Sequence, residues 1–128
     1  MKMAISPITE AIRVAEAGTT AEIRVHLSRR LLERDPYKRA LRLFRHYGMH
    51  RSSQRNAVLI YVNLRRRKFA IVGDDGIHSA VGQRYWEELA RELKRGFIST
   101  HPENAIAGTV RKLGEKLKDH FPAGLTRA

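Results

Sequence analysis

The chain has 128 residues, which suits one domain with a single hydrophobic core, and its 42% hydrophobic content excludes a disordered chain. It contains no cysteine, so disulfides, thiolate catalysis, iron–sulfur clusters and cysteine-bound zinc are excluded. Lysine and arginine number 25 against 13 acidic residues, and the formal net charge of +12 at pH 7 favours anionic partners.

The hydrophobic pattern does not predict a membrane-spanning segment. The longest strictly apolar run, Ala57 to Val62, is far shorter than the roughly 20 residues that cross a bilayer. The N-terminal segment MKMAISPITEAIRVAEA has no continuous apolar stretch, so we do not expect a signal peptide. We therefore expect a cytoplasmic protein.

The first predicted elements are a helix and a strand. Ser6 and Pro7 fit the N-cap and the first position of a helix, and Gly18 ends the helical pattern. The segment AEIRVHL (21–27) alternates apolar and polar residues, which predicts a strand with one apolar face. The apolar positions are Ile5, Ile8, Ile12 and Ala15 in the helix, and Ile23, Val25 and Leu27 in the strand.

A second helix and a hairpin follow. Asp35 and Pro36 begin the helix, Gly48 ends it, and its apolar stripe is Tyr37, Leu41, Phe44 and Tyr47. The run AVLIYVN (57–63) is apolar on both faces, which predicts a central strand covered on two sides. A short turn at 64–67 leads into KFAIVG (68–73), so the two strands should form an antiparallel hairpin.

Two more helices complete the predicted elements. The first runs from about His78 to Arg95, and Gly96 is expected to break it. Thr100 and Glu103 fit a capping box at the start of the last helix. The inward positions are Val81, Tyr85, Leu89 and Leu93 in the first helix, widened by Trp86 and Ala90, and Ile106, Val110, Leu113 and Leu117 in the second.

The element order α-β-α-β-β-α-α predicts a single-domain α/β layered sandwich. A small mixed β-sheet, made of a βαβ unit and a hairpin, should carry helices on both faces. The βαβ crossover is expected to be right-handed. We expect the domain to occupy residues 1–128, with a core from about 5 to 122 and a loose tail at 123–128.

The stretch Gly73-Asp74-Asp75-Gly76 lies where a strand leads into a helix, and it offers two adjacent carboxylates. Carboxylate oxygens are ligands for hard cations such as Ca²⁺ or Mg²⁺, so the turn is a candidate metal site. Glu22, on the polar face of the first strand, would complete a carboxylate cluster if that strand neighbours the central one. The alternatives are a helix-capping turn at 73–76 and an exposed or arginine-paired Glu22.

The other chemical motifs point to no assigned activity. His46 and His50 are four residues apart, but Gly48 separates them and should end their helix, so we do not expect a histidine metal site. The sequence contains no phosphate-binding glycine loop, dinucleotide fingerprint or nucleophile elbow. The catalytic residues are therefore unassigned.

Basic residues form two clusters, Arg24–Arg55 and the continuous run Arg65–Lys68. Such a face is either merely solvated or binds an acidic protein, a nucleic acid or an anionic membrane surface. No base-stacking aromatic pattern or sequence-reading motif accompanies the clusters. In the first cluster Glu33 and Asp35 oppose ten cations, which are Arg24, Arg29, Arg30, Arg34, Lys38, Arg39, Arg42, Arg45, Arg51 and Arg55.

The order of these motifs resembles the TPM domain, named for a thylakoid lumen protein, a photosystem II accessory protein and a nematode receptor modulator. The shared pattern is a loop with Asn56, a hydrophobic strand at 57–62, a second strand ending in Gly73-Asp74-Asp75-Gly76-Ile77, and a helix with Trp86. The strand AEIRVHL, Gly108 and Leu113-Gly114 extend the match, which covers roughly Ile5 to Pro122.

The resemblance implies an α/β sandwich and a binding or hydrolytic role. Some family members resemble acid phosphatases, and several resemble binders of calcium or other divalent cations. Carried over to this chain, Asp74 and Asp75, with Glu22, become the candidate ligands of Ca²⁺ or Mg²⁺, and Asn56 and Gly76 would shape the loops around them. An adaptor without catalytic activity, whose basic face binds an anionic macromolecule, is the alternative.

Overall fold

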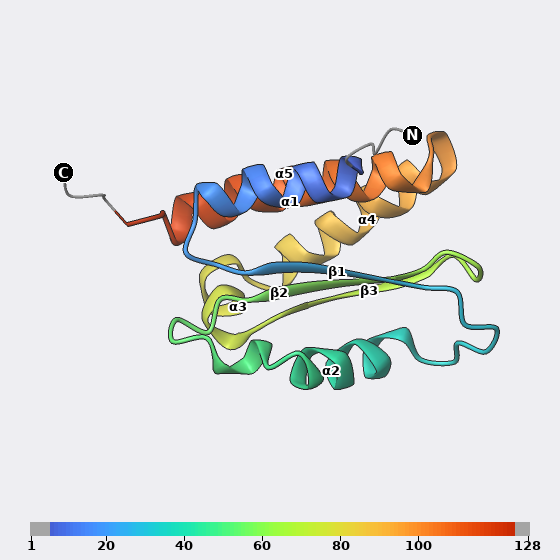
Figure 1. The fold of residues 1–128 in the computed structure, drawn as a ribbon, viewed down its shortest axis with the longest axis horizontal. Helices are drawn as coiled ribbons and strands as arrows, with labels where there is room; N and C mark the ends of the chain where they lie inside the picture. The colour runs from blue at the N-terminus through green and yellow to red at the C-terminus, as the bar shows by residue number, and fades with distance from the viewer. Residues whose placement is uncertain (1–5, 125–128) are drawn as a thin grey trace, which may run out of the picture.

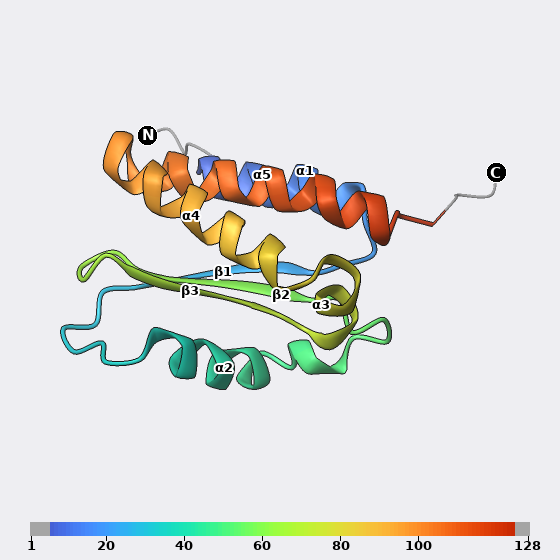
Figure 2. The ribbon, with the colours of Figure 1, turned by 180° about the vertical axis from the view of Figure 1, so that it is seen from behind.

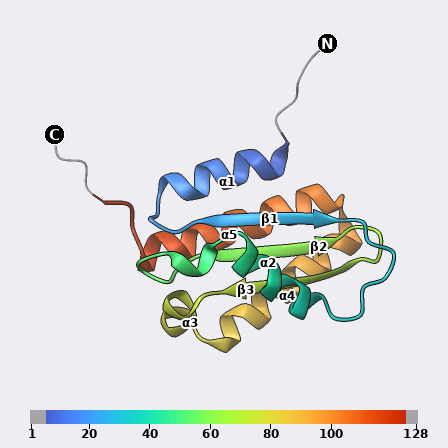
Figure 3. The same cartoon turned by 60° about the horizontal axis from the view of Figure 1, so that its bottom comes forward.

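A three-stranded sheet with the order β1-β2-β3 organises the computed structural model, which describes residues 6–124. Figure 3 shows the three strands side by side. Strand β1 (Ile23–Ser28) pairs in parallel with β2 (Val58–Asn63), and β2 pairs antiparallel with β3 (Lys68–Gly73). The parallel pair joined by a helix and the antiparallel hairpin confirm the predicted mixed sheet.

Helices cover both faces of the sheet, which confirms the predicted α/β sandwich (Figures 1 and 2). Helix α2 (Pro36–His46) lies on one face, followed by the short 3-10 helix η1 (Met49–Arg51). Helices α1 (Pro7–Ala17), α4 (Gln83–Ser99) and α5 (Pro102–His120) lie over the other face, and α3 (Asp75–Val81) sits at the end of the sheet. None of the helices within residues 6–124 combines the length and apolar character needed to span a bilayer.

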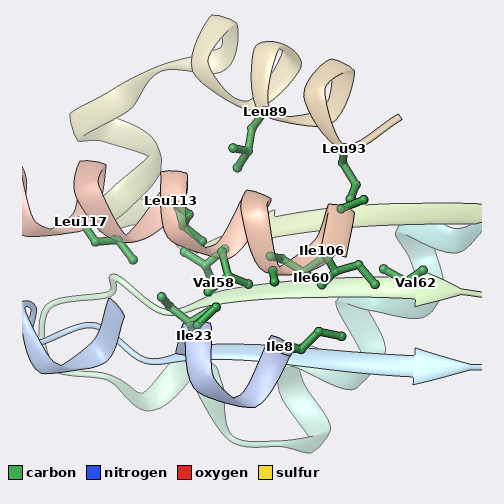
Figure 4. Packing of buried hydrophobic residues seen from close by; sticks show 14 of the residues in the cluster. Ile8, Ile23, Val58, Ile60, Val62, Leu89, Leu93, Ile106, Leu113 and Leu117 are labelled. Atoms are coloured by element: carbon green, nitrogen blue, oxygen red, sulfur yellow. The ribbon is translucent and has the colours of Figure 1, made fainter. Parts of the chain in front are cut away.

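The central strand separates two hydrophobic clusters. All six residues of β2 are buried, because alternate side chains point into opposite layers. Toward α2, Leu59 and Tyr61 meet Ala40, Leu43 and Phe44. The larger cluster joins β2 to α1, α4 and α5, and Figure 4 shows Ile8, Ile23, Val58, Ile60, Val62, Leu89, Leu93, Ile106, Leu113 and Leu117 packed together.

The first half of the chain follows its predicted helix boundaries, with changes at the apolar faces. Ser6 caps α1, Asp35 caps α2, and Gly48, at φ +71°, ends α2 in the left-handed region that glycine tolerates. The stripe predicted for α2 was wrong at Tyr37 and Leu41, which are 53% and 39% exposed. The inward face instead centres on Ala40, Leu43 and Phe44, because the small alanine lets the helix approach the sheet.

The apolar face predicted for the first strand was wrong at Leu27. This side chain is exposed because β1 is an edge strand and Leu27 lies near its end. Ile5, predicted to join the first helix, lies outside the described residues, as do residues 125–128 of the tail predicted to be loose.

The predicted helix from His78 to Arg95 was wrong at both ends and in its middle. Helix α3 begins earlier than predicted, at Asp75. The helical backbone is interrupted at Gly82, where φ is +83°. Gly96 does not end α4, which continues to Ser99, because Gly96 packs closely against Ala105 of α5. The predicted capping box at Thr100 was also wrong: His101 occupies the N-cap of α5, and no side chain caps this end.

Candidate functional site

The acidic turn lies at the end of the sheet where β3 leads into α3. Asp74 is the N-cap of α3, and its side chain accepts a hydrogen bond of 2.8 Å from the Asp75 backbone N–H. The Asp74 backbone N–H donates to the Ala57 carbonyl at 3.1 Å, which extends the β2–β3 ladder by one pair. The buried Asp74 therefore caps a helix and fixes a strand end.

Arg55 forms an ion pair with the carboxylate of Asp74. Its Nε and Nη2 donate to the two carboxylate oxygens at 3.0 and 3.1 Å, and Nη2 lies 3.6 Å from Asp75. The hydrogen bond to Asp74 and the charges of Asp74 and Asp75 raise the pKa of Arg55. Asp75 itself points into solvent, with 88% of its side chain exposed. The two predicted ligands are thus adjacent, but Arg55 pairs with Asp74 and engages both of its carboxylate oxygens.

Glu22 does not join this group. It precedes β1, and its carboxylate accepts a hydrogen bond of 3.0 Å from Arg24. The Glu22 backbone carbonyl accepts a hydrogen bond from the Val58 N–H, so Glu22 and Asp74 lie on opposite sides of β2. Their backbones are therefore separated by two strand spacings, or about 10 Å. No group of three His, Asp or Glu side chains within residues 6–124 is arranged to hold a metal ion.

A polar network supports the loop that carries Arg55. Buried Asn56 donates to the Thr20 hydroxyl at 3.1 Å and accepts from Ser52 at 3.0 Å, and Thr20 donates to Gln54. Arg55 itself adopts φ +52°, a conformation that few residues with a side chain adopt. This loop presses against the acidic turn, which is why Gly76 has no room for a side chain beside the Gln54 and Arg55 carbonyls.

The second candidate feature is a hollow beside α2, which we call the basic hollow. Its volume is about 280 Å³, and it lies between the β1–α2 loop and the first turns of α2. Five cations line it together with Leu32, Glu33 and Asp35; they are Arg30, Arg34, Lys38, Arg39 and Arg42. These residues belong to the cluster Arg24–Arg55, for which the sequence left open a solvated face or an anion-binding surface.

Both carboxylates in the basic hollow are already engaged. Asp35 caps α2 by accepting from the Lys38 backbone N–H at 3.0 Å. Buried Glu33 accepts hydrogen bonds from Tyr61 Oη and from Asn63 Nδ2. Burial alone would raise the pKa of Glu33, but these two hydrogen bonds and the charges of Arg30 and Arg39 outweigh it and lower the pKa.

The cations of the basic hollow have no comparable partners. No ion pair in the described part of the chain involves any of its five basic residues. Arg39 Nε is buried and lacks a hydrogen-bond partner, which is unfavourable unless an acceptor enters. Burial and the charge of Arg39 also lower the pKa of the neighbouring His26, as expected in a positive field.

His46 and His50, four residues apart in the sequence, lie on different elements. Helix α2 ends at His46 and the left-handed Gly48 redirects the chain, so His46 and His50 do not share a helix face. His101 caps α5 at one end and His120 ends it at the other. The prediction that Gly48 would separate His46 from His50 is confirmed.

Sequence reasoning missed the pairing of Arg55 with Asp74. No local pattern in the sequence predicts it, because Arg55 lies in the loop before β2 and Asp74 follows β3, 19 positions later. Exposed Leu31, Leu32 and Ile98 were also missed. Leu31 and Leu32 lie in a loop and carry no periodic signal, and Ile98 lies in the last turn of α4, beyond the glycine expected to end that helix.

The chain matches one protein family over most of its length. The family model described as TPM domain matches residues 3–116. The chain is similar to the BA42 protein from the psychrophilic bacterium Bizionia argentinensis, solved by NMR, with 34% identity and a TM-score of 0.81 over 90% of this chain and 79% of that one. The N-terminal domain of cg2496 from Corynebacterium glutamicum, at 13% identity, shares the fold with a TM-score of 0.68 over 91% and 74%. No curated protein matches the sequence.

Proposed function

The chain belongs to the TPM domain family, and we propose that this member is a binding domain whose basic hollow holds an anionic group of a partner. The observation that carries the proposal is the convergence of five basic side chains on one hollow whose two carboxylates are already engaged. Hydrogen bonds between charged groups are about twice as strong as neutral ones, so a phosphate or carboxylate is the favoured occupant. The two carboxylates that line the hollow, Glu33 and Asp35, are held in hydrogen bonds within the domain, so we assign binding and propose no reaction.

We expect the hollow to bind tripolyphosphate, a soluble probe, and replacing Lys38 and Arg42 by glutamine should weaken binding about tenfold, or about 1.4 kcal/mol. Titration calorimetry at about 50 mM and 200 mM salt measures both the affinity and its steep fall with ionic strength. The matched control replaces exposed Arg84 and Arg91 of α4 by glutamine, which removes the same charge elsewhere. Equal losses in the two double variants would mean that net charge alone, and no specific hollow, binds the probe.

The second candidate function is weak binding of Ca²⁺ or Mg²⁺ at the acidic turn. Two observations favour it: the Asp75 carboxylate is 88% exposed beside Asp74, and the Arg55 side chain that pairs with Asp74 is half exposed. In the structure, however, Asp74 is paired with Arg55 and Glu22 is paired with Arg24. The three carboxylates therefore do not form a set of ligands that fits a cation. The phosphatase activity suggested by the resemblance would depend on this cation, and we derive no hydrolytic step from it.

Arg55→Asn tests this second candidate, since asparagine tolerates the left-handed backbone and removes the competing guanidinium. If the turn binds cations, the variant should bind Ca²⁺ about tenfold more tightly than the natural protein. Amide NMR titration is the readout, with saturable shifts expected in residues 73–78. Adding Asp75→Asn should abolish these shifts. If the amide signals of residues 73–78 do not shift in either the natural protein or the Arg55→Asn variant, the turn does not bind cations and Asp74 only caps α3.

A further inference from the structure

One end of the sandwich gathers three connecting segments, which we call the docking end. The β1–α2 loop, the β2–β3 turn and the junction of α4 with α5 all lie there in Figures 1 and 2, opposite α3 and the acidic turn. Three aliphatic side chains protrude from these segments: Leu31, Leu32 and Ile98 are 61%, 71% and 80% exposed. Large aliphatic groups so exposed, on segments that share one end of the molecule, mark a surface that meets an apolar partner.

Hydrogen bonds tie these segments to one another and so fix the positions from which the aliphatic side chains protrude. Lys68 Nζ donates to the Glu33 carbonyl at 2.8 Å, and Asn63 Nδ2 donates to the Arg30 carbonyl at 3.0 Å. The β1–α2 loop is thereby tied to the hairpin on both sides of Leu31 and Leu32. Arg67 Nη1 donates to the Phe97 carbonyl at 3.3 Å, which ties the hairpin to the last turn of α4 beside Ile98.

The aliphatic side chains are surrounded by positive charge. Residues 29–36, 64–68 and 94–103 contain three acidic residues, of which Glu33 is buried and Asp35 caps α2, leaving Glu103. The exposed cations in the same segments are Arg29, Arg30, Arg34, Arg65, Arg66, Arg67, Lys68, Lys94 and Arg95.

Two neighbouring hollows open at this end. One is the basic hollow, which Leu32 borders. The other, of about 440 Å³, lies between the start of α2 and the end of α4, with Phe69, Phe97 and Ile98 as its apolar lining and Arg67, Lys68 and Lys94 as its cations. Each hollow therefore combines aliphatic or aromatic surface with cations, the combination that an acyl chain and its phosphate headgroup require.

We propose that the docking end binds the surface of an anionic lipid bilayer, with Leu31, Leu32 and Ile98 entering the interface and headgroup phosphates entering the basic hollow. The proposal rests on the anion-binding function above and names its partner. A nucleic acid would match the charge but offers no apolar layer for three aliphatic side chains, and bases stack on aromatic groups instead. A bilayer with acidic lipids supplies both the charge and the apolar layer.

Co-sedimentation with vesicles tests the proposal. The natural protein should bind vesicles of equal parts phosphatidylcholine and phosphatidylserine and should not bind pure phosphatidylcholine. Replacing Leu31 and Ile98, which do not line the basic hollow, by serine should weaken vesicle binding at least tenfold while the affinity for tripolyphosphate stays unchanged. The matched control replaces Val14 and Leu41, exposed on α1 and α2, by serine and should bind vesicles as the natural protein does. Thermal unfolding verifies that each variant is folded.

The other outcomes are decisive as well. Equal vesicle binding by both serine variants would overturn insertion of the aliphatic side chains. Binding to tripolyphosphate without binding to vesicles would overturn the bilayer as partner and leave the proposed anion-binding function intact. Failure of the natural protein to bind either probe would refute both proposals. Binding to polyuridylate that exceeds vesicle binding and is unaffected by the Leu31 and Ile98 replacements would identify a nucleic acid as the partner and overturn the bilayer.

Discussion

Replacing Gly76 by alanine is expected to lower the free energy of unfolding by about 1–3 kcal/mol, as forced overpacking does. The new methyl group would lie 2.6 Å from the Arg55 carbonyl oxygen and closer still to that of Gln54. Both are backbone atoms, which cannot rotate away, so the loop that carries Arg55 would have to move. The pairing of Arg55 with Asp74 should weaken in the same variant.

Gly108→Ala is the matched control for this substitution. Gly108 lies inside α5, and the methyl group there would have no neighbour closer than 3.9 Å, at the flexible end of Arg111. Alanine should therefore stabilise the protein by about 0.5–1 kcal/mol through its better helix propensity. Urea unfolding of the three proteins measures both effects. A neutral Gly76→Ala would show that the 52–56 loop is not packed against the acidic turn as described.

Replacing Glu33 by glutamine is expected to lower the free energy of unfolding by about 1–3 kcal/mol at pH 7. Tyr61 and Asn63 both donate to Oε1, and a neutral amide oxygen accepts these two hydrogen bonds more weakly than a carboxylate does. The same change should loosen the β1–α2 loop and so weaken tripolyphosphate binding. Because the five cations that line the basic hollow are unchanged, the glutamine variant should still bind the probe with a steep dependence on salt.

The pH dependence of this effect follows from the lowered pKa of Glu33. A carboxyl group whose folded pKa is depressed stabilises the folded state above its unfolded pKa, about 4.3, and loses that contribution as pH falls through the folded pKa. The stability difference between the natural protein and Glu33→Gln should thus be constant from about pH 7 to 5 and shrink below about pH 4. Guanidinium unfolding at several pH values measures it; a difference that grows on acidification would contradict the lowered pKa.

The sequence predicted the fold where a pattern repeats over several residues. The doubly apolar run of β2 and the Ile106, Val110, Leu113 and Leu117 spacing of α5 each report burial directly, and both are confirmed. The errors fell where one glycine decides the outcome. Gly82 breaks a helix through its positive φ, whereas Gly96 stays inside one because Ala105 lies against it. The local sequence does not distinguish these two cases, since the difference arises from tertiary contacts.

The candidate site was predictable only in its parts. Sequence reasoning found the acidic pair and the basic cluster, but their environment comes from residues far along the chain. Asp74 is paired with Arg55, 19 positions away. Glu33 accepts hydrogen bonds from Tyr61 and Asn63, 28 and 30 positions away. Exposure of Leu32 and Ile98 likewise depends on which surfaces the three layers leave open.

Amide NMR titration of the natural protein with tripolyphosphate tests the central claim most directly. If the basic hollow is an anion site, saturable shifts should concentrate in residues 30–42 and leave residues 73–78 unmoved. Shifts spread evenly over all exposed basic residues, without saturation, would contradict the claim. They would show that the positive charge of this domain attracts anions without binding them at a defined site.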